Sequence, residues 1–206
     1  MSDRSALFTV GHSTHSLEVF LDLLFKHKIS AIADVRSTPY SRYFPHFNKD
    51  ALAKSLKKYG IKYVFLGREL GARCDDPSCY VNGRVQYSRL AERPEFQEGI
   101  DRVKKGAGKY RIALMCAERE PLDCHRTLLV SRALDRQGLN VEHIHSDGHS
   151  ERHRDAMERL LDVIGLSRED FFLSKEELMA EALSRQEERV AYTDEILAAE
   201  EAGATI

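Results

Sequence analysis

Three reactive side chains occupy consecutive positions in the second half of the chain: Cys124, His125 and Arg126. An earlier cysteine, Cys116, ends an apolar run, and Glu118 lies in the acidic, proline-containing loop that joins the two segments. A thiol at the start of a helix and beside a cation has a lowered pKa and becomes nucleophilic. Histidine and glutamate can transfer the protons that such chemistry requires. The stretch therefore predicts four catalytic residues: Cys116, Glu118, Cys124 and His125.

The spacing of these cysteines excludes one anion loop and leaves a redox role open. A phosphatase loop of the phosphotyrosine type needs an arginine six residues after its cysteine, and those positions hold Leu122 and Val130. Cys116 and Cys124 could instead form a redox couple, for which the spacing alone is weak support.

Further polar side chains follow two other segments that have the composition of strands. Arginines, serine and histidine could donate to phosphate, and an aromatic ring could stack on a base. A glycine at a strand-to-helix turn lets backbone approach a ligand, and a helix N-terminus favours an anion. These arguments predict a substrate-binding set made up of Gly11, His12, Ser13, Asp34, Arg36, Tyr40, Arg42 and Arg126.

The same residue types also suit a metal ion. Thiolates and imidazoles are ligands for zinc or iron, so Cys116, Cys124, His125 and His12 form an alternative metal-binding set. Glu118 would then be a further ligand or the base beside a metal-bound water. No single segment has a recognised zinc spacing, so the metal content stays open.

Two more cysteines, Cys74 and Cys79, lie in a connection of some twenty residues between 67 and 87. A connection this long inside a domain is typically a lid or a binding loop. The spacing of the pair differs from the common two-residue spacing of zinc knuckles, and its role stays open.

The elements that must position these residues alternate between strands and helices. Apolar runs predict strands at 7–10, 31–35, 61–66, 110–115 and 141–145, and helical periodicity predicts helices from Ser16, from Asn48, over 88–105 and over 125–137. This order predicts an α/β fold with a Rossmann-like parallel sheet and flanking helices. Because the carboxyl ends of parallel strands share one edge, the polar clusters should converge there on one site.

The chain changes character near position 150. Residues 1–150 are expected to form the α/β domain that carries the site, and 151–206 a C-terminal helical extension packed on it. Two charged amphipathic helices are expected there, over 151–165 and from Ser174 to about Ala199, the second with a capping box. The extension could also serve as a dimer arm, so the oligomeric state stays open.

Composition limits the class of protein. The 206 residues carry a formal net charge of −2, which does not fit a strongly basic nucleic-acid coat protein but allows a local basic groove. No apolar run is long enough to cross a membrane, and the N-terminal residues lack an apolar signal core. We therefore expect a cytoplasmic protein without membrane contact, whose cysteines are thiols or metal ligands.

The motifs together resemble a known family. The run GHS after the first strand, then ADVRSTPYSRYFPHFN and LMCAEREPLDCHR, is similar to the DUF488 family of uncharacterised bacterial and archaeal proteins. The resemblance extends over nearly the whole chain, including 162–192. It implies an α/β domain and signature positions, but no reaction: Gly11, His12, Ser13, Asp34, Arg36, Cys116, Glu118, Cys124, His125 and Arg126.

Three functions remain compatible with the sequence. The leading hypothesis is an enzyme that acts on a phosphate-bearing substrate, a nucleotide or nucleic acid, at the carboxyl edge of the sheet. Arg36, Arg42 and Arg126 would bind the anion. The alternatives are a zinc- or iron-binding protein that uses the cysteine–histidine cluster, and a non-catalytic module that binds nucleic acid or protein through its aromatic–arginine loop.

Overall fold

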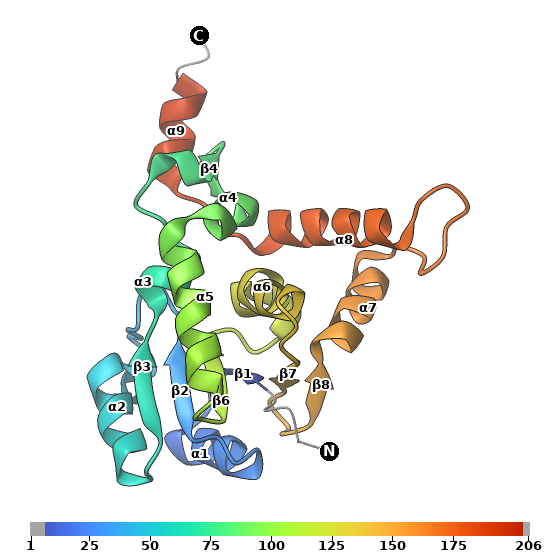
Figure 1. The fold of residues 1–206 in the computed structure, drawn as a ribbon. Helices are drawn as coiled ribbons and strands as arrows, with labels where there is room; N and C mark the ends of the chain where they lie inside the picture. Colours follow the sequence, from blue (N-terminus) through green and yellow to red (C-terminus); the bar gives the residue numbers. More distant parts are fainter. Residues whose placement is uncertain (1–6, 204–206) are drawn as a thin grey trace.

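The fold of the protein, seen in a computed structural model, is a twisted sheet between two layers of helices (Figure 1). The structure describes residues 7–203, so the ends of the two segments expected at 1–150 and 151–206 lie outside it. Within this range, six strands form one sheet in the order β3-β2-β6-β1-β7-β8. All neighbours pair in parallel except β7 and β8, which are antiparallel. The α/β fold with a mostly parallel sheet is as the sequence predicts.

The strands of this sheet are short, and the innermost ones are buried on both faces. Their bounds are β1 (Leu7–Gly11), β2 (Ala31–Asp34), β3 (Lys62–Phe65), β6 (Ile112–Cys116), β7 (Val141–Ile144) and β8 (Ser150–Arg152). Every residue of β1, β2 and β6 is buried, as expected for central strands of a parallel sheet. The edge strand β3 is partly exposed.

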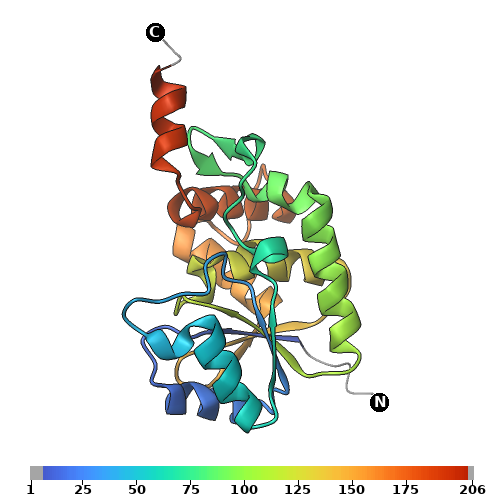
Figure 2. The ribbon, with the colours of Figure 1, turned by 90° about the vertical axis from the view of Figure 1, so that its left-hand side faces the viewer.

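Each face of the sheet has its own hydrophobic core, because successive side chains of a strand point to opposite faces. The helices α1 (Leu17–Lys26) and α2 (Lys49–Lys58) cover one face. The helices α5 (Pro94–Ala107), α6 (Arg132–Arg136) and α7 (His153–Ile164) cover the other (Figure 2). Phe8 and Met115 pack into the first core, and Leu7 and Leu114 into the second.

Three predicted helices differ from the observed ones in where they begin, break or end. The helix expected over 88–105 is two helices, α4 (Tyr87–Glu92) and α5, because Pro94 lacks an N–H and disfavours helical backbone at Arg93. The helix expected from 151 begins at His153, since Glu151 pairs with β7. The helix expected from Ser174 ends at Val190, and a separate helix follows.

The connection between 67 and 87 is ordered and contains its own short elements. These are α3 (Gly67–Leu70), the 3-10 turn η2 (Pro77–Cys79) and the hairpin of β4 (Tyr80–Val81) with β5 (Arg84–Val85). A further 3-10 turn, η1 (Pro45–Phe47), lies between β2 and α2.

The C-terminal helices are α8 (Lys175–Val190) and α9 (Glu195–Gly203). Leu178, Ala182 and Leu183 of α8 are buried in the same core as the sheet residues, whereas α9 extends away from the sheet (Figure 1). The helices between 7 and 203 are too short or too polar for a bilayer crossing.

Candidate functional site at the carboxyl edge of the sheet

The predicted site residues come from three adjacent strands. Strand β6 lies between β2 and β1, so the segments that follow all three strands meet at one edge. Beyond the last paired residues, the backbone N–H of His12 donates to the carbonyl of Cys116 at 2.9 Å, and that of Ser13 donates to Ala117 at 2.9 Å. This backbone pairing fixes the loop after β6 against the loop after β1.

Gly11 permits this close approach. A Cβ atom at Gly11 would overlap the carbonyl of Glu118, so any side chain there would push the loop after β6 away. Beneath the same loop lies Arg126, which is fully buried and donates to the carbonyls of Glu118 at 2.7 Å and Arg119 at 3.4 Å. The backbone that approaches Gly11 is thus the protein's own loop, where the sequence suggested a ligand.

Cys124 begins the helix that follows. Its carbonyl accepts from the N–H groups of Thr127 and Leu128, and its sulfur accepts from the N–H of Arg126 at 3.4 Å. The first turns are a π-helix, η4 (Arg126–Ser131), preceded by the 3-10 turn η3 (Pro121–Asp123). The hydroxyl of Ser131 donates to the carbonyl of Arg126 at 2.6 Å, which adds a side-chain bond across the five-residue turn. A sulfur in this position is stabilised as a thiolate by the helix N-terminus.

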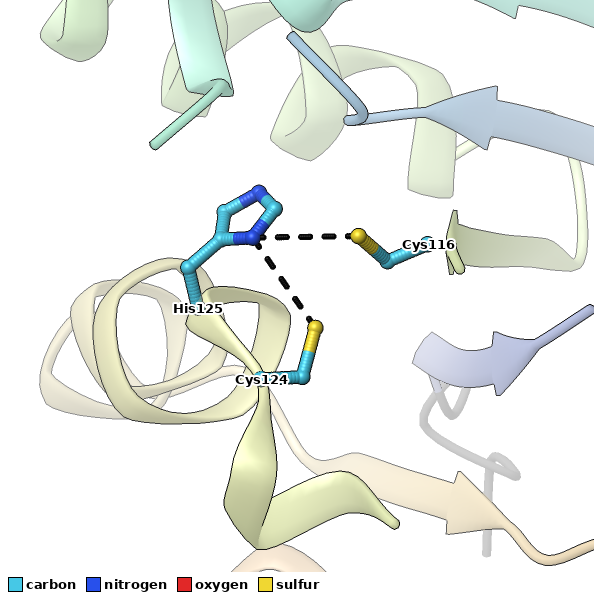
Figure 3. A group of neighbouring side chains, drawn as sticks. All are labelled: Cys116, Cys124 and His125. Atoms are coloured by element: carbon cyan, nitrogen blue, oxygen red, sulfur yellow. Dashed lines mark hydrogen bonds between the residues drawn. The ribbon is translucent and has the colours of Figure 1, made fainter. Parts of the chain in front are cut away.

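Cys116, Cys124 and His125 form a compact cluster (Figure 3). The Nδ1 atom of His125 lies 3.7 Å from Sγ of Cys116 and 3.9 Å from Sγ of Cys124. All three donor atoms lie within 4.8 Å of one another, and all three residues are buried. Among the described residues, this is the one group of three or more candidate ligands found together.

The two sulfur–nitrogen separations in the cluster are close to those of a tetrahedral metal site. Bond lengths of about 2.3 Å to sulfur and 2.1 Å to nitrogen put tetrahedral sulfur and nitrogen ligands about 3.6 Å apart. The two measured separations, 3.7 and 3.9 Å, exceed this by a few tenths of an ångström. The Nε2–H of His125 donates to the carbonyl of Val35 at 3.0 Å, which orients the ring and directs Nδ1 at the sulfurs.

Without a metal, the pKa values of the three side chains in the cluster shift in different directions. Burial alone would raise the pKa of Cys124, but the hydrogen bond with Cys116 and the positive charges of Arg126 and His125 hold it well below its usual value. Burial, reinforced by the neighbouring Cys124, raises the pKa of Cys116 well above its usual value. Burial would lower the pKa of His125, yet the Cys124 thiolate raises it. The pKa values of Cys124 and His125 thus shift in the directions that favour an ion pair between them.

Glu118 contacts this cluster without belonging to it. Its Oε2 atom lies 2.9 Å from Sγ of Cys124. Burial, followed by the negative charge of Cys124, raises the pKa of Glu118 above its usual value. A carboxyl group whose pKa is shifted toward neutrality can both donate and accept a proton. Glu118 therefore has the position and the chemistry of a general acid or base.

Asp34, Arg36 and His12 form a second, interlocked group beside the cluster. Arg36 donates to both carboxylate oxygens of Asp34, at 2.9 and 2.6 Å, and to the carbonyl of Phe47 at 2.8 Å. It also donates to Nε2 of His12 at 3.2 Å, while Nδ1 of His12 bonds the carbonyl of Ser13. Burial, followed by the charge of Arg36, lowers the pKa of His12 to about 4. His12 is thus neutral, with both nitrogens engaged, and lies outside the three-ligand cluster.

A cavity of about 350 Å³ opens in front of the cluster. Seven of the residues predicted from sequence line it: His12, Arg36, Tyr40, Cys116, Glu118, Cys124 and His125. The other five do not: Gly11 and Arg126 hold the loop after β6, Asp34 pairs with Arg36, and Ser13 and Arg42 lie outside the lining. The charge of Arg36 is already balanced by Asp34, so its contribution to an anion site is smaller than the sequence suggests.

The lining also contains residues that the sequence analysis missed. These are Ser37, Thr38, Ser41, Ala72, Arg73, Tyr87, Ala117, Asp123, Val190 and Tyr192. Arg73 stacks on the ring of Tyr192, with its guanidinium carbon 4.3 Å from the ring centroid. Ser37 and Thr38 directly follow Arg36, so proximity to a strand end was a usable signal. The sequence contains no comparable signal for the lining residues from 72–73 and 190–192.

The C-terminal part reaches the site through α8. Gln186 is buried and donates to the carbonyl of Leu122 at 3.0 Å and to Oδ1 of Asp123 at 2.9 Å. Glu187 accepts from the backbone N–H of Tyr87 at 2.5 Å. These contacts tie α8 to the loop before Cys124 and to the cavity wall.

Comparison with known proteins identifies a family and no function. No curated protein and no solved structure shows detectable similarity to the chain. A family model described as "Domain of unknown function DUF488" matches residues 16–133, a shorter range than the sequence resemblance suggested. The match includes Asp34, Arg36, Cys116 and Cys124, and Gly11, His12 and Ser13 lie just before it. With more than half of its residues matched, the chain belongs to the DUF488 family.

Proposed function

We propose that the protein is a metal-dependent enzyme whose ion, zinc or iron, is bound by Cys116, Cys124 and His125. The observation that carries this proposal is the convergence of two sulfurs and one imidazole nitrogen within 4.8 Å, on residues that line a cavity. Two thiolates and one imidazole leave one position of a tetrahedral ion free for water or substrate, the arrangement typical of catalytic rather than structural zinc.

Glu118 supports a catalytic role. It lies at the cluster without being one of the three ligands, and burial raises its pKa. In metal-dependent enzymes, a carboxyl group in this position accepts a proton from the attacking water or returns one to the leaving group. The metal would polarise the substrate or the water, and Glu118 would move the proton.

The cavity lining supports a small, polar substrate that carries phosphate. Ser37, Thr38 and Ser41 supply hydroxyl donors, and Arg73 supplies a cation without a carboxylate partner among the ion pairs of the described residues. Tyr87 is buried, and burial raises the pKa of its phenol, which keeps it as a hydrogen-bond donor. Charge-assisted hydrogen bonds from arginine suit phosphate oxygens.

Elemental analysis tests the proposal directly. The full chain is purified without an affinity-metal column from cells supplied with zinc and iron, and its metal content is measured. We expect about one ion per chain in the wild type and in Cys79→Ser, and a loss in Cys116→Ser and Cys124→Ser. A folded wild type that is metal-free and binds neither added Zn²⁺ nor added Fe²⁺ would overturn the proposal.

The capped position of Cys124 favours a second candidate, a metal-free enzyme in which the Cys124 thiolate attacks a phosphate-bearing substrate. The supporting observation is the N–H of Arg126, which donates to this sulfur at the helix start. Alkylation of the metal-free protein discriminates the two. This candidate predicts that iodoacetamide modifies Cys124 rapidly at neutral pH, and slow modification would exclude it.

A further inference from the structure

Cys74 and Cys79 are the sulfur pair that the proposed function leaves unused. Both are free thiols, with Cys79 buried and Cys74 partly exposed. Their Sγ atoms lie 3.0 Å apart, so the thiol of one directly contacts the sulfur of the other. A disulfide bond is about 2.05 Å long, so a shift of about 1 Å would close it.

The surrounding turn holds the two sulfurs together. The hydroxyl of Tyr80 donates to the carbonyl of Cys74 at 2.9 Å, and the N–H of Cys79 donates to the carbonyl of Asp76 at 3.0 Å. The carboxylate of Asp76 caps the short turn by accepting from the N–H of Ser78 at 2.9 Å. These bonds fix the backbone of the turn, and the N–H of Asp76 donates to Sγ of Cys74 at 3.4 Å.

Arg93 provides the electrostatics of a reactive thiol. Its Nη1 atom donates to Sγ of Cys74 and lies 3.8 Å from Sγ of Cys79. A cation beside a partly accessible sulfur is the environment in which cysteines react with oxidants. Burial, followed by the hydrogen bond with Cys74, raises the pKa of Cys79 to about 11. Cys74 is partly exposed and contacts Arg93, so it is the better placed of the two sulfurs to react first.

A small pocket gives access to Cys74. It measures about 20 Å³ and is lined by Cys74, Arg93 and Glu95 among others. A cavity of roughly 10–15 Å³ already accepts a water molecule, so a small oxidant has room beside the sulfur. No third candidate metal ligand joins the pair among the described residues, which favours redox chemistry over metal binding.

We propose that Cys74 and Cys79 form a reversible redox pair that hydrogen peroxide converts into an intramolecular disulfide. The Cys74 thiolate attacks the peroxide, an S–O bond forms, the O–O bond breaks, and the hydroxide that leaves takes up a proton to become water. The Cys79 thiol then attacks the sulfenic acid, the S–S bond forms, and the S–O bond breaks. The thiol proton and the hydroxyl group leave as a second water. The two sulfurs lose two electrons in all, which reduce the peroxide, and a small thiol reverses the reaction.

The disulfide would form next to the cavity wall. Arg73 directly precedes Cys74, its backbone N–H donates to the hydroxyl of Ser37 at 3.0 Å, and its side chain stacks on Tyr192. Oxidation would thus fix the segment that carries the cation of the cavity. This inference does not rest on the metal site, since the two cysteine pairs share no residue.

Peptide mapping tests the proposal. The full chain is treated with hydrogen peroxide, its remaining thiols are alkylated, and trypsin is added. Cys74 and Cys79 fall in one tryptic peptide, 74–84, whereas Cys116 and Cys124 fall in two, 112–119 and 120–126. We expect the peptide 74–84 to be unalkylated and two hydrogen atoms lighter, and dithiothreitol to reverse this change. A peptide that gains only oxygen, or that stays fully alkylated, would overturn the proposal.

Two conservative variants test the order of the steps. In Cys79→Ser, the sulfenic acid on Cys74 cannot be resolved, so dimedone should label the peptide 74–84. In Cys74→Ser, we expect peroxide to oxidise the remaining Cys79 at least about tenfold more slowly than it oxidises Cys74 in Cys79→Ser. Equal rates in the two variants, or rates no faster than in urea-unfolded chain, would contradict the assigned roles.

Discussion

The protein has two pairs of cysteines whose sulfurs lie close together, and the two pairs differ in the side chain beside them. Cys116 and Cys124 lie buried at the carboxyl edge of the sheet, with the imidazole of His125 beside both sulfurs. Cys74 and Cys79 lie in a turn of the connection after α3, with the guanidinium of Arg93 beside them. An imidazole brings a lone pair that can share a metal ion with the sulfurs, whereas a guanidinium has none to offer. Our two proposals therefore assign ligation to one pair and oxidation to the other because of the group beside the sulfurs.

The largest expected effect is on metal affinity, which should depend on Cys124 and not on Cys79. The binding free energy of a thiolate-rich zinc site, about 10–16 kcal/mol, is shared among about four ligands, so Cys124→Ser should weaken binding about 100- to 1000-fold. The matched change Cys79→Ser should leave the affinity unchanged. Competition with a coloured chelator measures both. Equal losses in the two variants would remove the distinction between the pairs.

The next effect concerns the backbone that holds the cluster. Gly11→Ala would force a methyl group against the carbonyl of Glu118 and should lower the free energy of unfolding by about 2–3 kcal/mol. Gly108→Ala is the control, because Gly108 has ordinary space around it and a φ of −70°. Urea denaturation measures both variants. A loss at Gly11 no larger than at Gly108 would show that the loop after β6 can shift freely.

Acid should lower the stability of the α/β fold through His153, which is buried beside His143. Burial lowers the pKa of His153 from 6.5 to about 4, and its Nδ1 lies 3.0 Å from Nε2 of the buried His143. Because the folded pKa is the lower one, this stability is complete above about pH 6.5 and is lost as the pH falls toward about 4.

Between pH 7 and 5, this one group should remove about 2 kcal/mol of stability. His153→Gln should flatten the dependence by that amount in urea titrations at the two pH values. A variant with the same pH slope as the wild type would contradict the assignment.

The smallest expected effect concerns the anion that the cavity would bind. Arg73 lines the cavity and Arg42 does not, so Arg73→Ala should weaken the binding of inorganic phosphate about tenfold, the worth of one charge-assisted hydrogen bond. Arg42→Ala should change it little. Calorimetry at low salt compares them, and the reverse order would favour the aromatic–arginine loop as the binding surface.

Much of the site could be predicted because it follows from strand position. Cys116 ends a strand and Cys124 begins the next helix, so the parallel-sheet rule brings them to one edge without knowledge of the fold in detail. The same rule could not give the direction of a side chain. Arg126 adjoins His125 in sequence, yet it points into the protein because it bonds the carbonyls of the loop after β6.

Residues from distant segments were beyond the reach of the sequence. Arg73 comes from the connection after α3 and Tyr192 from the segment that follows α8, and only tertiary packing brings them to the same cavity. The break at Pro94 was different, because the proline itself is a local signal for a helix start.

X-ray absorption spectroscopy of the zinc-loaded protein tests the central claim most directly. The account predicts an ion with two sulfur ligands at about 2.3 Å and nitrogen or oxygen ligands at about 2.0–2.1 Å, with the sulfur signal unchanged in Cys79→Ser and reduced in Cys116→Ser. An ion bound by nitrogen and oxygen alone, or a sulfur signal that depends on Cys74 and Cys79, would contradict it.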